Sequence, residues 1–318
     1  MEATGAIKGV IKALCISEAR GTAKHTVPSV RCLAGHGLEG DAHAGSWHRQ
    51  VSLLSYEQVQ AFNAAGGAVQ PGDFGENILA CGIDFSALPV GTLLMAGEVV
   101  LKLTQIGKEC HNHCQIFQRV GDCIMPRKGV FAIVEHGGEL RPGMAMTAQL
   151  PAADVPLRAA VMTLSDKGAA GQRQDTSGPR AAELLTAAGY EIVEQVLLPE
   201  NRPQIEKELK RLADSRQVDL IITTGGTGFS LRDVTPEATL AVATRLAPGI
   251  AEAIRMESMD ITRRAMLSRG VSVLRNSTLI VNLPGSKKAV EEALAIVLPE
   301  LEHGLRILRG TAKECGRA

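Results

Sequence analysis

Aromatic residues, excess charge and long apolar runs are scarce or missing in this chain. Aromatic residues make up 3% of its 318 positions, and 34 basic residues balance 34 acidic ones. A chain without net charge gives no reason to expect bulk nucleic acid as a partner. No apolar run approaches the roughly 18 residues that a membrane helix needs, and the first residues lack the basic-then-apolar pattern of an export signal. We therefore expect a cytoplasmic protein with neither a nucleic-acid nor a membrane partner.

Cysteine and histidine are nearly absent from the second half of the chain. Of the seven cysteines only Cys315 follows Cys123, and only one histidine, His303, follows His136. An odd number of cysteines without an export signal argues against a disulfide framework. The length exceeds that of a usual single domain, so we expect two domains that carry different chemistry.

The Pro- and Ala-rich segment 151–157 predicts a linker between a domain of residues 1–150 and a domain of residues 158–318. Before the linker, the segments are short and β-like. Residues 92–106 predict a hairpin, and only residues 55–65 predict a convincing helix. This pattern predicts a β-rich, barrel-like N-terminal domain.

After the linker, short apolar strands alternate with amphipathic helices. Such alternation predicts a parallel sheet with helices on both faces, in which ligands bind beyond the carboxyl ends of the strands. We therefore expect a C-terminal α/β domain of three layers with a mostly parallel sheet. The predicted strands and helices cover residues 159–164, 177–189, 191–198, 203–215, 220–223 and 278–283.

A glycine-rich loop follows the third of these strands, in the segment Thr224-Gly225-Gly226-Thr227-Gly228. Three glycines in four residues let backbone N–H groups turn toward one point, a geometry suited to phosphate or another anion. The loop lacks the Gly-Lys-Ser/Thr of a Walker motif and the third spaced glycine of a dinucleotide fingerprint. By itself it is also compatible with a simple tight turn.

An acidic residue, Asp233, follows the glycine loop, and Thr235 and Pro236 predict the N-cap and first residue of a helix. A carboxylate beside a phosphate site repels the phosphate unless a cation lies between them. Mg²⁺ fits this role, since one or two carboxylates and substrate phosphates commonly hold it. The alternative is that Asp233 only helps to cap the helix.

A second strand-to-helix junction, Pro284-Gly285-Ser286, precedes Lys287 and Lys288. Cations in the first turn of a helix oppose its dipole, typically by about 0.3–1 kcal/mol. Their position is explained if an anion binds at this end, although the two lysines could also form an ordinary solvated pair.

Together these segments resemble the molybdopterin adenylyltransferases, which include the bacterial Mog-type enzymes and a domain of gephyrin. The resemblance covers nearly all of residues 158–310, in order and at matching spacing. Molybdate-inserting proteins and the competence-damage family share the fold, but residues 232–238 and 265–269 favour the adenylylating branch. The motifs that carry the resemblance are residues 164–167, 171–175, 224–228, 232–238, 265–269 and 282–285.

The resemblance implies an enzyme of molybdenum cofactor biosynthesis, in which molybdopterin's terminal phosphate attacks the α-phosphate of Mg-ATP and pyrophosphate leaves. Positioning and charge neutralisation would carry this catalysis. The resemblance makes Asp233 catalytic and a Mg²⁺ ligand. It gives Glu200 a second catalytic position where the family often has Asp, and the longer arm could move a metal by about 1 Å. The nucleotide- and molybdopterin-binding residues that it implies are Ser165, Asp166, Asp175, Gly225, Gly226, Thr227, Gly228, Thr235, Pro236, Glu237, Ser268, Asn282, Pro284, Gly285 and Ser286.

The first half concentrates sulfur and imidazole at Cys110, His111, His113, Cys114 and Cys123. Such side chains can hold zinc, but their spacing fits no standard zinc pattern. Buried, inert thiols are the simpler interpretation for several of them.

This half resembles a MOSC domain over roughly residues 7–149, through residues 37–45, 74–77, 88–92 and 104–110. Cys110 matches the characteristic cysteine of that family, and the neighbouring Lys108 could favour its thiolate. The resemblance implies binding of molybdenum cofactor, or of sulfur, at Cys110.

The leading hypothesis is a fused biosynthetic enzyme whose second domain activates molybdopterin and whose first domain binds a later form of the cofactor. A molybdate-insertion protein and molybdenum enzymes are the expected partners, and relatives of the second domain suggest a homo-oligomer, a trimer through that domain. Two alternatives stay open: a carrier of molybdopterin or molybdenum cofactor without turnover, and a sulfur-transfer protein centred on Cys110.

Overall fold

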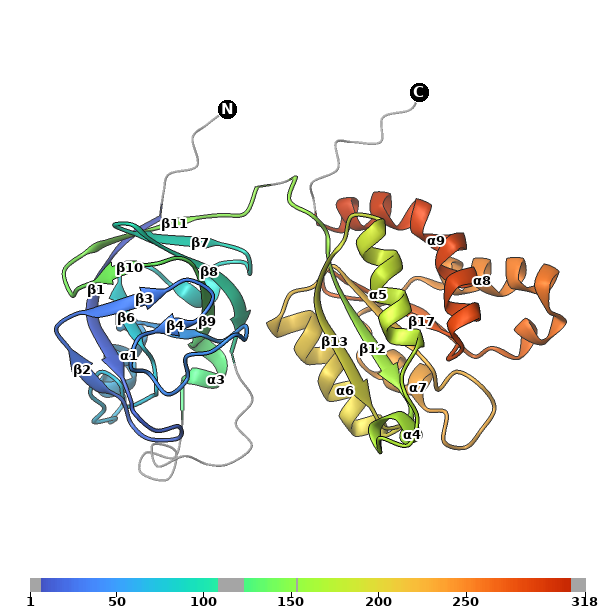
Figure 1. Cartoon of the computed structure of the whole chain (residues 1–318), viewed down its shortest axis with the longest axis horizontal. Coiled ribbons are helices and arrows are strands. Elements are labelled where there is room, and N and C mark those ends of the chain that lie inside the picture. The colour runs from blue at the N-terminus through green and yellow to red at the C-terminus, as the bar shows by residue number, and fades with distance from the viewer. Residues whose placement is uncertain (1–6, 108–122, 153, 310–318) are drawn as a thin grey trace. The chain divides into compact units, whose positions relative to one another are not determined.

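The computed structural model describes residues 7–107, 123–152 and 154–309. The chain divides into two compact units, Met1–Ala152 and Ala153–Ala318 (Figure 1). Within the described ranges, no helix combines the length and apolarity that crossing a membrane requires.

Seven strands of the first unit close into a barrel, in the order β1-β11-β7-β8-β9-β5-β6 and back to β1. Among the described strands of this unit, only the β5–β6 pair is parallel. Aliphatic side chains such as Leu14, Leu53, Leu94 and Leu101 fill the interior, which confirms the predicted barrel-like domain. The strands are β1 (Ile7–Ile16), β5 (Val51–Ser55), β6 (Ile78–Cys81), β7 (Leu93–Ala96), β8 (Val99–Ile106), β9 (Val130–His136) and β11 (Ala145–Gln149).

Short elements surround the barrel. A second core packs helix α1 against the outer face of the barrel, where Val59 and Phe74 meet Leu54, Leu79 and Phe131. The predicted helix and hairpin are confirmed as α1 and the β7–β8 pair. The remaining elements are β2 (His25–Val27), β3 (Val30–Leu33), β4 (Gly37–Leu38), β10 (Gly138–Leu140), α1 (Tyr56–Ala64), η1 (Phe85–Ala87) and α3 (Met125–Lys128).

The second unit is built on a six-stranded sheet in the order β13-β12-β14-β17-β16-β15. The four strands β13, β12, β14 and β17 run parallel, and β16 and β15 are antiparallel additions at one edge. The strands are β12 (Arg158–Leu164), β13 (Glu191–Leu198), β14 (Leu220–Thr224), β15 (Arg245–Leu246), β16 (Ser272–Arg275) and β17 (Thr278–Leu283).

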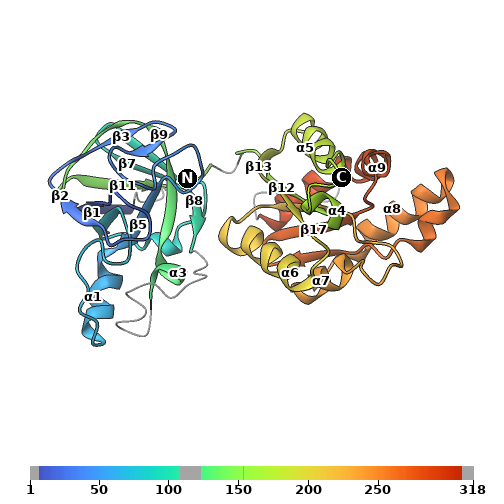
Figure 2. The same ribbon diagram turned by 60° about the horizontal axis from the view of Figure 1, so that its bottom comes forward.

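Helices cover both faces of this sheet (Figure 2). Successive residues of a strand point to opposite faces, so Val161 packs under α5, α8 and α9 while Met162 packs under α6 and α7. The predicted three-layer α/β domain is confirmed. Its helices are α4 (Asp166–Ala169), α5 (Ser177–Ala187), α6 (Arg202–Lys210), η2 (Arg211–Ser215), α7 (Thr235–Ala241), α8 (Pro248–Ile261), η3 (Arg263–Leu267) and α9 (Lys287–Leu308).

Two local predictions need correction. Val234, not Thr235, is the N-cap of α7, and the hydroxyl of Thr235 makes no capping bond because it is buried inside the domain. The helix predicted over 203–215 is α-helical only to Lys210 and ends in a π-helical turn.

The parallel register brings the loops of interest to one edge of the sheet. Thr163 of β12 is paired with Thr224 of β14, and Thr224 with Leu283 of β17. The residues that follow these three strands therefore meet at the carboxyl edge, where open α/β sheets bind ligands.

Candidate active site

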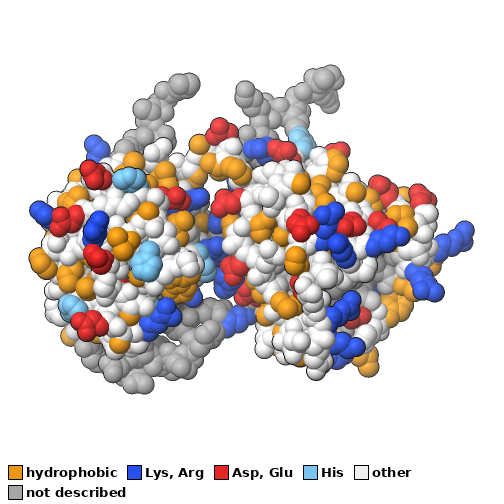
Figure 3. All heavy atoms as spheres, in the orientation of Figure 1, with side chains coloured by type: hydrophobic (Ala, Val, Ile, Leu, Met, Phe, Trp, Pro, Cys, Tyr) orange, Lys and Arg blue, Asp and Glu red, His pale blue; other side chains and the backbone are white. Residues whose placement is uncertain are grey.

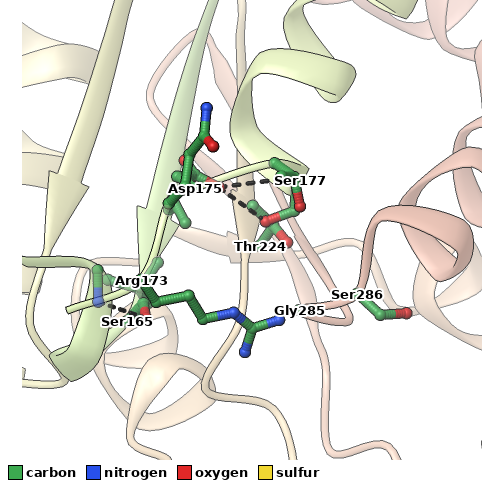
Figure 4. A pocket seen from close by; sticks show the side chains of 12 residues that line it. Ser165, Arg173, Asp175, Ser177, Thr224, Gly285 and Ser286 are labelled. Carbon is green, nitrogen blue, oxygen red and sulfur yellow. Dashed lines mark hydrogen bonds between the residues drawn. The ribbon is translucent and has the colours of Figure 1, made fainter. Parts of the chain in front are cut away.

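A cavity of about 300 Å³ opens at this edge of the sheet (Figure 4). Its wall is polar: Ser165 follows β12, Thr224 ends β14, and Asp175 and Ser177 begin α5. The same wall includes Gly285 and Ser286, which lead into α9. The full lining is Thr163, Leu164, Ser165, Gly168, Arg173, Gln174, Asp175, Thr176, Ser177, Thr224, Gly285 and Ser286.

Two helix N-termini and one arginine make this cavity suited to an anion. Helices α5 and α9 both begin at its wall, and backbone N–H groups at a helix N-terminus favour negative charge. The guanidinium of Arg173 extends in the direction of Gly285 in Figure 4, and Arg173 makes no ion pair within the described ranges. An arginine without a carboxylate partner, beside two helix N-termini, can bind a phosphate.

Asp175 organises the start of α5. Its Oδ1 accepts hydrogen bonds from the Ser177 N–H at 3.0 Å, the Ser177 hydroxyl at 3.1 Å and the Gly178 N–H at 3.1 Å. A side chain at Gly178 would meet the Thr163 hydroxyl at 2.2 Å, so the helix can approach β12 only with glycine there. Asp175 therefore shapes the cavity wall through its contacts with backbone.

The glycine loop begins at the cavity residue Thr224 and passes the end of β12. Gly225 has φ +101°, and a Cβ there would lie 2.3 Å from the Leu164 carbonyl, so only glycine fits between the two strand ends. Its N–H donates to the Leu283 carbonyl at 3.2 Å. The amides of Gly226, Thr227 and Gly228 have no protein acceptor within the described ranges, which leaves a row of donors for an anion.

Three carboxylates lie close to that loop. Asp166 Oδ1 accepts from the Glu200 N–H at 2.9 Å, and its Oδ2 accepts from Arg232 Nη2 at 2.7 Å. Asp233 Oδ2 accepts from the Ser230 N–H at 3.1 Å. The structure thus gathers Asp166, Glu200 and Asp233, which are far apart in the chain.

Glu200 is the unusual member of this group. Burial, with the negative charges of Asp233 and Asp166 adding to it, raises the pKa of Glu200 to about 7. Its Oε2 is buried without a hydrogen-bond partner, and so is the hydroxyl oxygen of Thr235. A Cβ on Gly226 would lie 2.3 Å from the first and 2.2 Å from the second, so both oxygens face one point beside the loop. A buried oxygen without a hydrogen-bond donor lowers the stability of the fold unless a ligand or cation binds to it.

Arg269, which belongs to the motif 265–269 but was given no site role of its own, connects the glycine loop to α7. Its side chain bonds to the carbonyls of Gly228 and Asp233 and forms an ion pair with Glu237. The Ser268 hydroxyl accepts from the Gly270 N–H at 3.3 Å, within the same turn.

The other expected site residues have structural contacts. The Asn282 side chain is buried, donates to the hydroxyls of Thr223 and Thr239 and accepts from the Val271 N–H, so it does not line the cavity. The Pro284 carbonyl accepts from the Thr224 hydroxyl at 2.8 Å. Pro236 is buried in the first turn of α7.

The sequence patterns also missed Arg173, Thr163 and Thr224 among the cavity residues. Thr163 lies near the end of a buried strand, and its pattern marks it only as a strand residue. Thr224 ends β14 and begins the glycine-rich segment 224–228, in which only the residues from Gly225 onward were expected to bind. Arg173 lies within the motif 171–175, two residues before Asp175, and nothing in the sequence distinguishes it as a cavity residue.

In the barrel, the buried polar side chains surround Asp41. Its carboxylate contacts the ammonium group of Lys24 and accepts from Asn77 Nδ2 at 3.0 Å, the Ser17 N–H at 3.1 Å and the His43 N–H at 2.9 Å. Burial alone would raise its pKa, but the hydrogen bonds from His43 and Lys24 hold the pKa of Asp41 below its usual range. Asp41 is therefore a fully partnered carboxylate.

Cys110, the residue expected to bind cofactor or sulfur, lies outside the described residues, as does Cys114. Cys123 is buried, and His136 is exposed and bonds to the Glu98 carbonyl. In the part of the chain that the structure describes, no group of three or more His, Cys, Asp or Glu side chains is arranged to hold a metal.

Basic and acidic side chains are interspersed on the visible face of each domain (Figure 3), as the balanced composition leads one to expect. Fold and site define a class: an α/β domain with an anion-binding cavity and adjoining carboxylates at the carboxyl edge of a parallel sheet.

Comparisons with known proteins identify the family. A family model described as "Probable molybdopterin binding domain" matches residues 160–303, and one described as "MOSC domain" matches residues 40–147. The chain is 39% identical over 157 residues to a molybdopterin adenylyltransferase of Helicobacter pylori, across 47% of this chain and 86% of that protein. It is 44% identical over 140 residues to that of Haemophilus influenzae, across 43% of this chain and 71% of that protein. Through its second domain the chain belongs to the molybdopterin adenylyltransferase family, and its first domain is a MOSC domain.

A solved structure of a molybdopterin biosynthesis enzyme, MoaB, from Thermus thermophilus is also similar. It shares 45% sequence identity, covers 48% of this chain and 97% of its own, and aligns with a TM-score of 0.47.

Proposed function

We propose that the second domain adenylylates molybdopterin with Mg-ATP. One observation carries the proposal: the buried Oε2 of Glu200 has no partner and lies next to Asp233, beside a glycine loop and an anion-sized cavity. Such a carboxylate is stabilised when a cation and a phosphate bind together at this edge. Family membership supports the same activity.

The residues present fit Mg²⁺. The donors are carboxylate oxygens of Asp233 and Glu200, the ligand type that this hard cation prefers. Two protein carboxylates do not fill the coordination sphere of Mg²⁺, so positions are left for oxygens of the substrate phosphates. When bound, Mg²⁺ would neutralise charge on the phosphates of ATP.

The reaction forms one P–O bond and breaks another. A terminal phosphate oxygen of molybdopterin attacks the α-phosphorus of ATP, and the bond from that phosphorus to the bridging oxygen breaks, so that pyrophosphate leaves with the electron pair. The nucleophile is already an anion, so no Ser, Cys or His base is needed. The protein then has to position the two substrates and neutralise the charge on their phosphates.

Different residues around the glycine loop position the substrates and neutralise their charge. The amides of Gly226, Thr227 and Gly228 and the guanidinium of Arg173 bind phosphate oxygens. Ser165, Asp175 and Ser286 shape the pocket in which one substrate lies. Asp233 and Glu200, which lie against Gly228 and Gly226, would hold the cation.

The test is pyrophosphate release from ATP and Mg²⁺, with and without molybdopterin. We expect molybdopterin-dependent release by the wild type and a loss of roughly 10³-fold in kcat for Asp233→Ala, since a metal contact contributes several kcal/mol to transition-state stabilisation. Asp214→Ala is the matched control, because Asp214 is an arginine-paired aspartate away from the site. Glu200→Asp keeps the charge but shortens the arm by a methylene, so it should lower kcat by roughly 10- to 100-fold, less than Asp233→Ala does.

If the wild type binds molybdopterin tightly but releases no pyrophosphate, the second domain is not an adenylyltransferase but a carrier of molybdopterin.

For the first domain we propose, from its MOSC match, binding of molybdenum cofactor. Loss of cofactor binding in Cys110→Ala, with pyrophosphate release intact, supports it; unchanged cofactor binding refutes a role for Cys110.

A further inference from the structure

Arg269 lies between η3 and β16, and it contacts the segment that carries Asp233. Its backbone N–H donates to the Thr227 carbonyl at 2.9 Å. Its side chain donates from Nε to the Gly228 carbonyl at 2.7 Å and from Nη2 to the Asp233 carbonyl at 2.6 Å. Nη1 pairs with Glu237 in the first turn of α7. One side chain therefore joins three points of the loop and helix around the site.

The loop from Gly228 to Asp233 has little else to hold it. Phe229 is 69% exposed and Leu231 is 100% exposed, so neither apolar side chain anchors the loop in the core. The bonds inside the loop are short-range, between Ser230 and Asp233 and between Arg232 and Ser230. Arg232 reaches Asp166, but this ion pair is largely exposed and therefore weak.

The guanidinium of Arg269 links the two ends of this loop. Gly228 begins it and Asp233 ends it, and both carbonyls accept from the same planar group. The ends are also in contact, because a Cβ on Gly228 would lie 2.8 Å from Asp233 Oδ2. Fixing both carbonyls thus fixes the direction in which the Asp233 carboxylate leaves the backbone.

We propose that Arg269 is a positioning residue that sets the Asp233 carboxylate relative to Glu200 for the cation. The inference rests on the proposed adenylyl transfer. Lysine cannot replace Arg269, since an ammonium group is a point charge and does not reproduce the planar fork that bonds two carbonyls and a carboxylate.

The experiment compares Arg269→Ala and Arg269→Lys with a matched control, Arg275→Ala. Arg275 also pairs with a carboxylate, Asp214, and donates to a backbone carbonyl, that of Val242, but it lies at the other end of β16. All variants are made in the full chain. The readouts are kcat and KM for ATP, the Mg²⁺ concentration for half-maximal pyrophosphate release, and Mn²⁺ binding in the presence of ATP by electron paramagnetic resonance.

Both Arg269 variants should lose roughly 10- to 100-fold in kcat, as expected when a reacting group is displaced by about 1 Å. They should also need more Mg²⁺ for half-maximal release and bind Mn²⁺ more weakly, while KM for ATP changes less than about threefold. Arg275→Ala should lower the unfolding temperature but leave kcat and the Mg²⁺ requirement within about twofold.

Two results would overturn the inference: an Arg269→Ala enzyme with wild-type kcat and metal affinity, or an Arg275→Ala enzyme impaired as much as Arg269→Ala. Mn²⁺ binding separates this failure from failure of the proposed function. A wild type that releases no pyrophosphate refutes the activity, yet weaker Mn²⁺ binding in Arg269→Ala still supports the positioning of Asp233.

Discussion

Each domain contains a glutamate whose pKa burial raises to about 7, Glu76 in the barrel and Glu200 in the α/β domain. Each lies close to a glycine with positive φ. The Gly72 N–H donates to Glu76 Oε1 at 2.7 Å, and Gly226 lies against the carboxylate of Glu200. Each also has one oxygen that is buried without a partner.

Their surroundings differ. Glu76 is fully buried, and the Lys24 ammonium group, which interacts with it electrostatically, is already paired with Asp41. Glu200 stands at a surface edge with Asp166 and Asp233 next to it, and the cationic side chain that acts on it, Arg232, forms its ion pair with Asp166. A raised pKa alone therefore does not mark a catalytic carboxylate. The distinction comes from what lies beside it: a closed core in one domain, and in the other a glycine loop whose Gly226, Thr227 and Gly228 amides have no protein acceptor within the described ranges.

The largest expected difference is between a substitution in the barrel that lowers stability and one in the α/β domain that lowers activity. Asp41→Asn leaves the buried Lys24 without its partner and should lower the barrel's free energy of unfolding by about 3–5 kcal/mol. Asp233→Asn should change the unfolding of the α/β domain by less than about 1 kcal/mol, while pyrophosphate release falls by roughly 10³-fold. Chemical denaturation and the release assay measure the two effects. If both variants lost stability and Asp233→Asn kept its activity, Asp41 and Asp233 would not differ in role.

A smaller contrast involves the two glycines. Gly72→Ala places a Cβ 2.2 Å from the Lys24 carbonyl at φ +94°, so it should destabilise the barrel by roughly 1–3 kcal/mol. Gly226→Ala places a Cβ against Glu200 Oε2 and the Thr235 hydroxyl, both side-chain atoms that can move. It should therefore reduce kcat by roughly 10- to 100-fold with a smaller loss of stability. Equal losses of stability with unchanged kcat would show that Gly226 has only a structural role.

The smallest effect concerns pH. Each of these glutamates has a pKa of about 7 in the folded state and about 4.5 in the unfolded state. Its contribution to the free energy of unfolding is therefore fully present below pH 4.5 and is lost as the pH rises through 7. At pH 8, Glu76→Gln and Glu200→Gln should each stabilise their own domain by roughly 1–2 kcal/mol, allowing for solvent screening.

Mg²⁺ with ATP distinguishes the two glutamates. It should raise the unfolding temperature of the α/β domain more at pH 8 than at pH 6, because the cation binds the ionised carboxylate. Glu200→Gln should abolish this difference and Glu76→Gln should not. Differential scanning calorimetry across pH 5 to 8 measures it, and a Mg²⁺ effect independent of pH would contradict Glu200 as a ligand.

Much of the α/β domain could be predicted from local patterns. The strands 191–198 and 278–283 have the predicted bounds: β17 is a buried apolar run, and β13, a partly exposed strand at the edge of the sheet, is bounded by Gly189 and Pro199. The parallel arrangement then implies that Ser165, Gly225 and Pro284 share one edge. The barrel was predicted less fully: only one hairpin and one helix were placed, since its closure depends on pairings such as that of β1 with β11 from opposite ends of the domain.

The sequence by itself determined the two kinds of fold, the glycine loop and the acidic residue that follows it, because periodicity and turn chemistry are local properties. Only the tertiary structure decided that Glu200 faces Gly226, that Asn282 bonds inside the domain, and that Arg269 joins Gly228 to Asp233. The contact between Arg269 and Gly228 links residues 41 positions apart. The direction of a loop side chain depends on the packing of the elements at both ends of the loop, which no local pattern encodes.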